Sequence, residues 1–362
     1  MAGAIVSSLR ERRPDCQIVF TFFSPSAERI APHVGADITA YLPWDVRRDL
    51  RHAITALRPD VVAFIRTEVW PTLLQEAQRA GARVALVNAP LGARSSRIRP
   101  FARRLLGRTY AQLDAVGAVS DGDAERFARL RVPRDRVAVT GDARFDQVSQ
   151  RIAGLDRNAT LLQTVRQGPP AVVAGSTWPE DESRLIAAWS RIRDRGARLI
   201  IAPHEPRSAH IARLEAALDS ARIPHARIDH AAENGTHALI VDRTGILADL
   251  YAAARVAYVG GGFGQHGLHS VIEPAALGVP VIFGPHHGNA IEAKDLVRAG
   301  GGFVVRSEAE LAERLASLLD DPVAGRAAGD WVRSKCGGAG RNAALVLALL
   351  DGSETSGRRR GQ

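Results

Sequence analysis

Residues 258–286 read YVGGGFGQHGLHSVIEPAALGVPVIFGPH. A buried apolar strand leads into a loop in which four of the five residues from 260 to 264 are glycine, a helical pattern follows, and a second apolar strand ends at Gly284. Glycine lets the backbone approach a ligand closely, and a helix beginning near His269 would point free amides at an anion. The stretch therefore predicts a phosphate-binding βαβ unit, although a tight strand-to-helix turn without a ligand explains the glycines equally well.

The pair Glu273-Pro274 favours the ligand-binding interpretation. A carboxylate one turn into the predicted helix is well placed to accept hydrogen bonds from a nucleotide ribose. The alternative is a glutamate near a helix terminus that the helix dipole stabilises. Together with the Gly-rich loop, Glu273 predicts a nucleotide site.

The same alternation of β-rich runs and helical patterns extends along almost the whole chain and predicts parallel βαβ units. In the first half the expected strands are Gln17–Phe23, Ile38–Leu42, Val61–Arg66, Arg83–Asn88, Ala115–Val119 and Val137–Thr140. In the second half they are Ala171–Ala174, Arg198–Ala202, Ala238–Val241, Val256–Val259, Val279–Phe283 and Gly302–Val305. The expected fold is α/β, with two Rossmann-like doubly wound domains facing a cleft.

Helical patterns and their boundaries complete this picture. We expect helices at Ala2–Arg13, Pro179–Asp194 and Ala309–Leu319, and one capped by Asp121. Periodicity lapses between about residues 146 and 168, which predicts a first domain over residues 1–150 and a second over residues 165–338. A last helix over residues 340–351 follows a Gly-rich break at residues 337–340.

Composition limits the classes of function. The 362 residues carry a net charge of +9, and all but two of the 48 Lys and Arg residues are arginine, so the surface favours anionic partners without selecting one. Cys16 and Cys336 have no metal-ligand or redox spacing and are expected to be unpaired thiols in a reducing compartment. No apolar run approaches the roughly 18–20 residues that span a bilayer, and no signal peptide is recognisable. We expect a cytoplasmic protein whose membrane contact is peripheral.

Six motifs of this chain occur in a recognisable order, namely Thr67–Pro71, Ala174–Thr177, Val241–Leu247, Gly267–Pro274, Gly278–Val281 and Gly284–His286. Together they resemble the 3-deoxy-D-manno-octulosonic acid (Kdo) transferases of lipid A assembly, which have the GT-B fold. The resemblance implies transfer of Kdo from CMP-Kdo to a lipid A precursor at the cytoplasmic face of the inner membrane, without a metal, another cofactor or a nucleic-acid partner. It also implies that the last helix packs back on the first domain.

The resemblance assigns the donor site residue by residue. The implied donor-binding residues are Ser176, Pro203, His204, Gly245, Ile246, Leu247, His269, Ser270 and Glu273. His204 stands where the family commonly has arginine, which makes the charge there depend on pH, although Arg207 lies nearby. Ser270 stands where the family commonly has asparagine. Each histidine has an ordinary alternative, a local hydrogen bond without a role in binding.

The catalytic residues implied by the resemblance are Glu68 and Arg144, which would stabilise the transition state. Arg144 replaces a lysine of the family pattern and keeps its positive charge. The family's general base, a glutamate after glycine ahead of the first helix, has no counterpart here, because Ala2–Arg13 matches that first helix. We expect slow transfer or none unless another carboxylate acts as the base, and Glu68 is the first candidate.

One segment of the first half combines basic and apolar residues. It contains arginines at 94, 97, 99, 103, 104 and 108 and the apolar side chains of Ile98, Phe101, Leu105, Leu106 and Tyr110. Such a basic amphipathic segment can lie on an anionic membrane or contact lipid A phosphates, and a solvated helix face is the alternative.

Three functions remain open: the Kdo transferase, another GT-B enzyme that uses a UDP- or ADP-sugar or acts as an epimerase, and a catalytically inactive glycolipid-binding homologue.

Overall fold

The chain folds into two units, which a computed structural model describes over residues 1–156, 158–230, 237–321 and 323–358. Unit 1 contains residues 1–147 together with the C-terminal segment from Lys335, and unit 2 is Val148–Ser334. Each unit has its own parallel sheet and its own core.

Unit 2 has seven strands in the order β13-β12-β11-β7-β8-β10-β9, all parallel. The strands are β7 (Ala171–Thr177), β8 (Arg198–Pro203), β9 (His225–Arg227), β10 (Ala238–Ile240), β11 (Ala254–Val259), β12 (Val281–Phe283) and β13 (Gly302–Val304). The chain starts in the middle at β7, winds outward through β8, and then returns to the other side of β7 with β11. The strand order therefore reverses between β7 and β11, where open α/β sheets bind their ligands.

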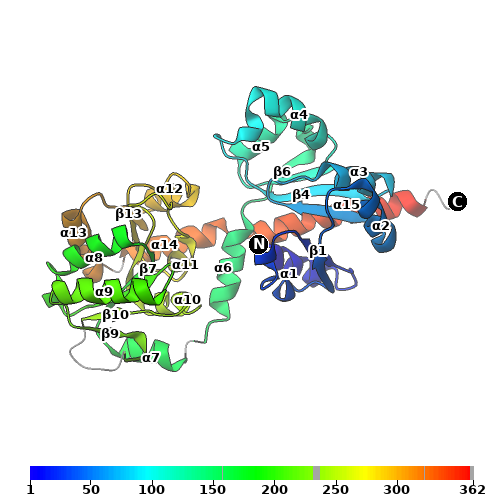
Figure 1. Ribbon diagram of the computed structural model, residues 1–362. Helices are drawn as coiled ribbons and strands as arrows, with labels where there is room; N and C mark the ends of the chain where they lie inside the picture. Colours follow the sequence, from blue (N-terminus) through cyan, green and yellow to red (C-terminus); the bar gives the residue numbers. More distant parts are fainter. Residues whose placement is uncertain (157, 231–236, 322, 359–362) are drawn as a thin grey trace. The chain divides into compact units, whose positions relative to one another are not determined.

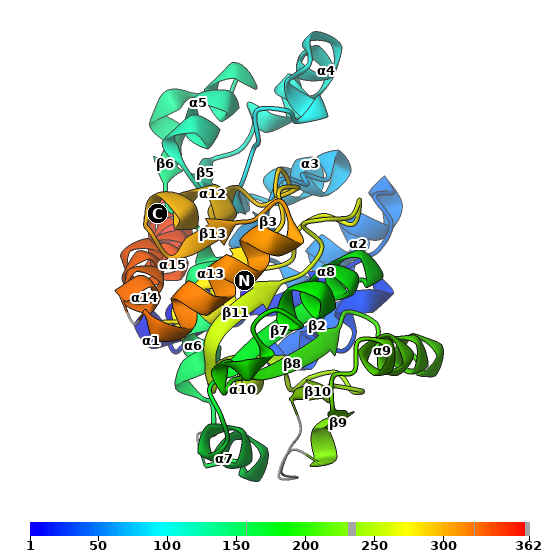
Figure 2. The same cartoon turned by 90° about the vertical axis from the view of Figure 1, so that its left-hand side faces the viewer.

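Helices cover both faces of this sheet. The helices are α7 (Thr160–Gln167), α8 (Pro179–Trp189), α9 (Ser208–Ser220), α10 (Leu247–Tyr251), α11 (Ile272–Ala276), α12 (Ile291–Arg298), α13 (Glu308–Asp320) and α14 (Val323–Lys335). Alternate residues of β7 explain the layering, because Val172 packs with α8, α9 and α13, whereas Val173 packs with α7 and α10. Figure 2 shows α8, α9 and α13 on one side of β7 and β8.

Unit 1 has a four-stranded parallel sheet in sequence order, β3 (Val61–Ile65), β4 (Arg83–Ala89), β5 (Ala115–Ala118) and β6 (Val137–Val139). A separate parallel pair is formed by β1 (Val19–Phe22) and β2 (Ile38–Tyr41). The expected double winding is therefore absent from the described strands of unit 1. All four residues of β2 are exposed, as expected for a strand that no helix layer covers.

The helices of unit 1 are α1 (Ala2–Arg12), α2 (Arg47–Leu57), α3 (Pro71–Arg79), α4 (Pro100–Tyr110), α5 (Asp121–Arg129) and α15 (Gly338–Arg358), while α6 (Ala143–Ala153) spans the boundary between the units. The expected cap at Asp121 is wrong, because the hydroxyl of Ser120 accepts from the amide of Asp123 and Asp121 is already helical. Helix α8 ends at Trp189, earlier than expected.

The last helix, α15, packs against α1 and β4 within unit 1 (Figure 1). The fully buried Asn342 fixes it, since its side-chain oxygen accepts from the amide of Asn88 at 2.8 Å and from the Thr140 hydroxyl at 3.0 Å. The expected Gly-rich break is present but shorter than expected, because α14 ends at Lys335 and α15 already begins at Gly338. A Cβ on Gly338 would lie 2.8 Å from the carbonyl carbon of Asp142, so glycine here permits close packing.

Candidate functional site

The reversal point of the unit 2 sheet joins the ends of β7 and β11. Ser176 has a φ of 53° and lies at an irregularity of the β7–β8 register. A Cβ on Gly260, which follows β11, would lie 2.2 Å from the carbonyl oxygen of Ser176, so only glycine fits there. The two chain segments are therefore in direct backbone contact at the edge where the Gly-rich loop begins.

A buried carboxylate fastens the same edge. Asp181, in the first turn of α8, accepts from the amide of Trp178 at 3.0 Å, the amide of Gly261 at 2.8 Å and the hydroxyl of Tyr258 at 2.7 Å. Burial, reinforced by Asp181, raises the pKa of Tyr258 well above its ordinary value. Three accepted hydrogen bonds satisfy Asp181 inside the protein, so we interpret it as a structural clamp that positions the Gly-rich loop.

Four aromatic rings gather where β7, β8 and the Gly-rich loop end. The ring of His266 stacks on Trp178 with centroids 3.6 Å apart, and His204 lies 5.0 Å from Trp178 and 4.4 Å from His269. The indole Nε1 of Trp178 donates to Nε2 of His269 at 3.2 Å. Burial first, and then His204 and His266, lower the pKa of His269 against an opposing effect of Asp181. The structure thus brings together two predicted residues, His204 and His269.

A second group lies near the end of β7. A Cβ on Gly175 would lie 2.1 Å from the hydroxyl of Tyr251 and 2.8 Å from a methyl carbon of Leu247, so both side chains pack on the strand. Glu273 is electrostatically coupled to Tyr251, whose pKa is raised by burial first and by Glu273 second. Glu273 also forms an ion pair with Arg151 at 2.8 Å. Leu247 and Glu273 therefore surround one end of β7.

The remaining predicted donor residues occupy the loops of the same edge. Gly245 has a φ of 98° and precedes α10, for which Ile246 is the N-cap. Pro203 ends β8 and is buried, and the amide of the exposed His204 donates to the carbonyl of Thr177 at 3.0 Å. Arg207, considered as a source of fixed charge, forms an exposed ion pair with Glu205 at 3.0 Å.

The helix expected near His269 begins later and is shorter. Helix α11 covers only Ile272–Ala276, and Ser270 lies outside it, where its hydroxyl accepts from the amide of Ile272 at 3.4 Å. Tertiary hydrogen bonds hold the preceding residues out of the helix, because the amide of Leu268 donates to Asn289 and that of His269 to the carbonyl of Gly260. The expectation that a helix beginning near His269 points its free amides at an anion is therefore wrong.

Unit 1 carries a separate cavity of about 440 Å³ beside Glu68. The cavity is lined by Asp45, Thr67, Glu68, Val69, Trp70, Pro71, Ser96, Arg97, Leu106, Thr109 and Tyr110. Asp45 accepts from the amides of Thr72 and Leu73 at 3.2 and 3.0 Å and so caps α3. Glu68 is exposed and makes no hydrogen bond or ion pair within the described part of the chain. Glu68 is thus the acidic group of this cavity that is available to a ligand.

Arg144 does not line this cavity. Its guanidinium and its amide contact the buried Asp142 at 2.8 and 3.0 Å, at the start of α6. Glu68 and Arg144 both belong to unit 1, and only Glu68 is among the residues that line the cavity.

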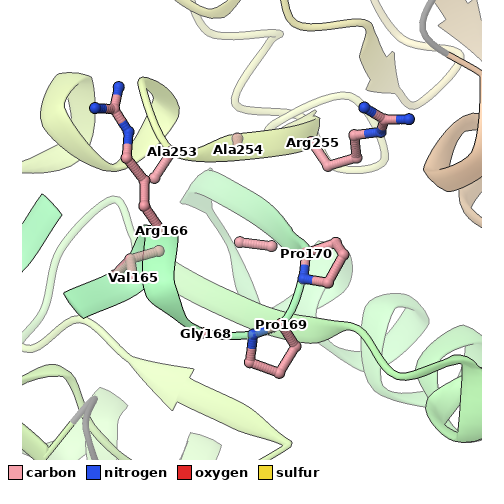
Figure 3. Close-up of a pocket in the computed structure, with 9 residues that line it drawn as sticks. Val165, Arg166, Gly168, Pro169, Pro170, Ala253, Ala254 and Arg255 are labelled. Carbon is pink, nitrogen blue, oxygen red and sulfur yellow. The ribbon is translucent and has the colours of Figure 1, made fainter. Parts of the chain in front are cut away.

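A cavity of about 250 Å³ in unit 2 lies at the opposite edge of the sheet, where β7 and β11 begin. Figure 3 shows that it is lined by Pro169 and Pro170 and that the guanidinium groups of Arg166 and Arg255 point away from each other. Ligands of open α/β sheets bind at the carboxyl ends of the strands, so we assign this cavity no role in the chemistry.

Sequence reasoning missed Trp178, His266 and Tyr251. Trp178 directly follows β7, so its position at the carboxyl edge was a usable signal, and His266 lies in the Gly-rich loop. Tyr251 ends α10 and had no such signal.

Among the described residues no three His, Cys, Asp or Glu side chains gather as a metal site. No helix in the described ranges is long and apolar enough to cross a membrane.

Comparison with known proteins identifies the family of this chain. A family model described as 3-Deoxy-D-manno-octulosonic-acid transferase (kdotransferase) matches residues 1–147. The 3-deoxy-D-manno-octulosonic acid transferase of Chlamydia muridarum is 30% identical over 336 residues, which cover 88% of this chain and 74% of that protein. The transferase of the same name from Haemophilus influenzae is 25% identical, with 88% of this chain and 75% of that protein covered.

Solved structures show the fold. A glycosyltransferase from Rickettsia africae superposes with a TM-score of 0.63 at 13% identity, covering 97% of this chain and 94% of that chain. The fold is therefore GT-B, as the sequence predicted. The 30% sequence identity to the Chlamydia muridarum transferase, over most of both chains, shows the family as well as the fold. The chain belongs to the 3-deoxy-D-manno-octulosonic acid transferase family.

Proposed function

We propose that the chain transfers Kdo from CMP-Kdo to a lipid A precursor, with the nucleotide bound at the reversal point of the unit 2 sheet. Membership of the family supports this reaction. The observation that carries the site is the convergence of the β7 end, the Gly-rich loop and Glu273 on one sheet edge. No observation favours an epimerase or an inactive binding protein.

Donor binding at this edge rests on groups of different chemistry. Glu273, whose side chain is 25% exposed, would accept hydrogen bonds from the ribose hydroxyls of the nucleotide. The positive φ of Gly245 lets its loop turn toward the base, and Ser270 offers a hydroxyl. The imidazoles of His204 and His269 lie at the same edge as the Gly-rich loop and would contact the anionic part of the donor.

Leaving-group stabilisation has to come from individual donors, because α11 is only five residues long. Polar groups fixed before the reaction stabilise developing charge without reorganising. Asp181 fixes the Gly-rich loop through the amide of Gly261, and Trp178 fixes His269. These contacts supply a preorganised edge on which the CMP leaving group would form, and no metal takes part in the proposed reaction.

The acceptor would bind in the unit 1 cavity, where Glu68 is the available carboxylate. Arg97 and Tyr110 lie close to one another in the same cavity, where burial raises the pKa of Tyr110, Arg97 opposes that shift and Glu68 adds to it. A cation beside a carboxylate suits a phosphorylated sugar, whose phosphate would meet Arg97 while a hydroxyl meets Glu68. Trp70, which packs on Phe23 with centroids 5.0 Å apart, adds an aromatic wall.

The helix that lines this cavity also presents an apolar surface. Phe101 and Leu105 of α4 are 84% and 67% exposed and lie one turn apart, beside Arg104 and Arg108. Leu106 and Tyr110, on the opposite side, pack into the unit 1 core. We infer that α4 rests on an anionic membrane and holds the cavity near a lipid-anchored acceptor.

Replacing Glu273 with alanine is expected to weaken CMP binding by about 1–3 kcal/mol, the cost of losing charge-assisted hydrogen bonds to the ribose. Titration calorimetry of the full chain with CMP and UDP measures this, and we expect wild type to bind UDP far more weakly than CMP. Arg151→Ala is the matched control, because it removes the ion-pair partner and leaves the carboxylate. A lower melting temperature for Glu273→Ala with unchanged CMP affinity would make Glu273 a structural residue.

Replacing both Phe101 and Leu105 with serine is expected to weaken binding to vesicles that contain anionic phospholipid by about ten-fold, because the buried apolar area is lost. Co-sedimentation with vesicles measures the effect, and raised salt should weaken wild-type binding as well. Ile291→Ser, on α12 of unit 2, is the control, since Ile291 is 64% exposed but lies outside the proposed surface. Equal loss in the control and the double variant would contradict the assignment.

A further inference from the structure

The ring cluster at the donor edge fixes a protonation state. An indole Nε1–H is only a donor, so Nε2 of His269, which receives it at 3.2 Å, has to be an acceptor. A neutral imidazole that accepts at Nε2 carries its proton on Nδ1. The geometry therefore selects one of the two tautomers of His269.

The surroundings keep this imidazole neutral. Half-burial and the imidazoles of His204 and His266 lower the pKa of His269, and Asp181 is the group that acts in the opposite direction. Asp181 accepts from two amides and one hydroxyl, and no hydrogen bond joins it to His269 within the described part of the chain. Nδ1 of His269 has no hydrogen-bond partner among the residues that the structure describes, and its N–H is left for a ligand.

The indole itself is held from two sides. The ring of His266 lies parallel to the indole, with centroids 3.6 Å apart and an interplanar angle of 1°. The backbone amide of Trp178 donates to the carboxylate of Asp181 at 3.0 Å. Trp178 therefore cannot turn its N–H away from His269 without breaking the stack.

We propose that Trp178, held in place by His266, is a positioning residue of the donor site. Trp178 fixes His269 as the Nδ1–H tautomer, and the Nδ1–H of His269 donates to an anionic oxygen of the nucleotide-sugar. This inference rests on the proposed function only for the identity of the ligand. The tautomer is a property of the protein alone and is measured without one.

The first experiment reads the tautomer directly in the full chain. The imidazole nitrogen chemical shifts are measured on histidine-labelled protein at mildly alkaline pH. The signals of His269 are those lost in a His269→Asn variant. We expect them to show a protonated Nδ1 and an unprotonated Nε2. Trp178→Phe should shift the ring toward the Nε2–H form that unconstrained imidazole favours. Trp189→Phe is the control, because Trp189 is buried in unit 2 and its Nε1 has no hydrogen-bond partner in the described part of the chain.

The second experiment asks whether the Nδ1–H binds nucleotide. The side-chain amide of asparagine can occupy the place of Nδ1, and that of glutamine the place of Nε2. His269→Asn should therefore retain CMP affinity within about two-fold, while His269→Gln and Trp178→Phe should each lose about ten-fold. In the His269→Asn background, Trp178→Phe should have no further effect, because the histidine through which it acts is gone.

The outcomes separate the inference from the proposed function. An Nε2–H tautomer in wild type, a tautomer that Trp178→Phe leaves unchanged, or equal losses in the asparagine and glutamine variants would each overturn the inference. Wild-type protein that binds no CMP would overturn the proposed donor, and the nitrogen shifts would still decide the tautomer.

Discussion

Glu68→Gln is expected to slow Kdo transfer by about 10²- to 10⁴-fold and to leave CMP affinity unchanged, since a positioned acid–base group contributes a factor of this size. Glu68 is exposed in the unit 1 cavity and makes no hydrogen bond or ion pair within the described ranges, so its carboxylate is available to an acceptor hydroxyl. Glutamine keeps the shape of the side chain and removes the charge. Initial rates at saturating donor, together with CMP titration, measure both quantities.

Asp45→Asn tests whether any acid in this cavity would give the same result. Asp45 lines the cavity but caps α3 through the amides of Thr72 and Leu73. We therefore expect a loss of about 1 kcal/mol in stability and a rate close to wild type. If Asp45→Asn slows transfer as much as Glu68→Gln does, Glu68 has no special role.

Gly260→Ala should destabilise the protein by about 3 kcal/mol, which is large for the addition of one methyl group. The new Cβ would lie 2.2 Å from the carbonyl oxygen of Ser176 and 2.7 Å from Cα of Thr177. These neighbours are backbone atoms of β7, so relief requires the ends of β7 and β11 to move apart. Chemical denaturation measures the stability loss, and CMP affinity should fall with it because the donor edge is displaced.

Gly288→Ala is the matched control for this substitution. Gly288 lies in the loop after β12, where a Cβ would meet nothing within 4 Å. Its stability should stay within about 0.5 kcal/mol of wild type. Equal stability of the two alanine variants would show that β7 and β11 are not in contact through Gly260.

Much of the fold was predictable because buried parallel strands read as short apolar runs between helical patterns. Val61–Arg66 and Arg198–Ala202 were expected, and β3 and β8 cover nearly the same residues. Strand β9 (His225–Arg227) was missed, because two half-exposed residues and one exposed residue carry no hydrophobic pattern. Its place in the sheet comes from pairing with β10.

Other misses come from tertiary contacts that outweigh local sequence. The apparent lapse between residues 146 and 168 contains α7 and most of α6, which bury few side chains. The Gly-rich break before α15 is shorter than expected, because the carboxylate of Asp146 accepts from the amides of Gly337 and Ala339 at 2.6 and 2.9 Å and caps the helix there. Neither contact is visible in the sequence.

The candidate site was predictable in its position but not in its contacts. The sequence placed the Gly-rich loop and Glu273 at the end of one strand, and the structure has both at one sheet edge, because glycine spacing and strand boundaries are local properties. The late start of α11 depends on Asn289, which lies after the next strand. The tautomer of His269 depends on Trp178, which follows β7, and β7 neighbours β11 in the sheet but is separated from it along the chain by β8, β9 and β10. Such pairings arise only when the chain has folded.

The most direct measurement is transfer of Kdo by the wild-type chain to a lipid A precursor, with CMP-Kdo generated in situ and UDP-N-acetylglucosamine as the alternative donor. The proposal predicts a Kdo-modified acceptor by mass spectrometry, release of CMP in equal amount, and loss of product in Glu68→Gln and Glu273→Ala. Transfer or epimerisation of the UDP-sugar, without any Kdo product from CMP-Kdo, would contradict it.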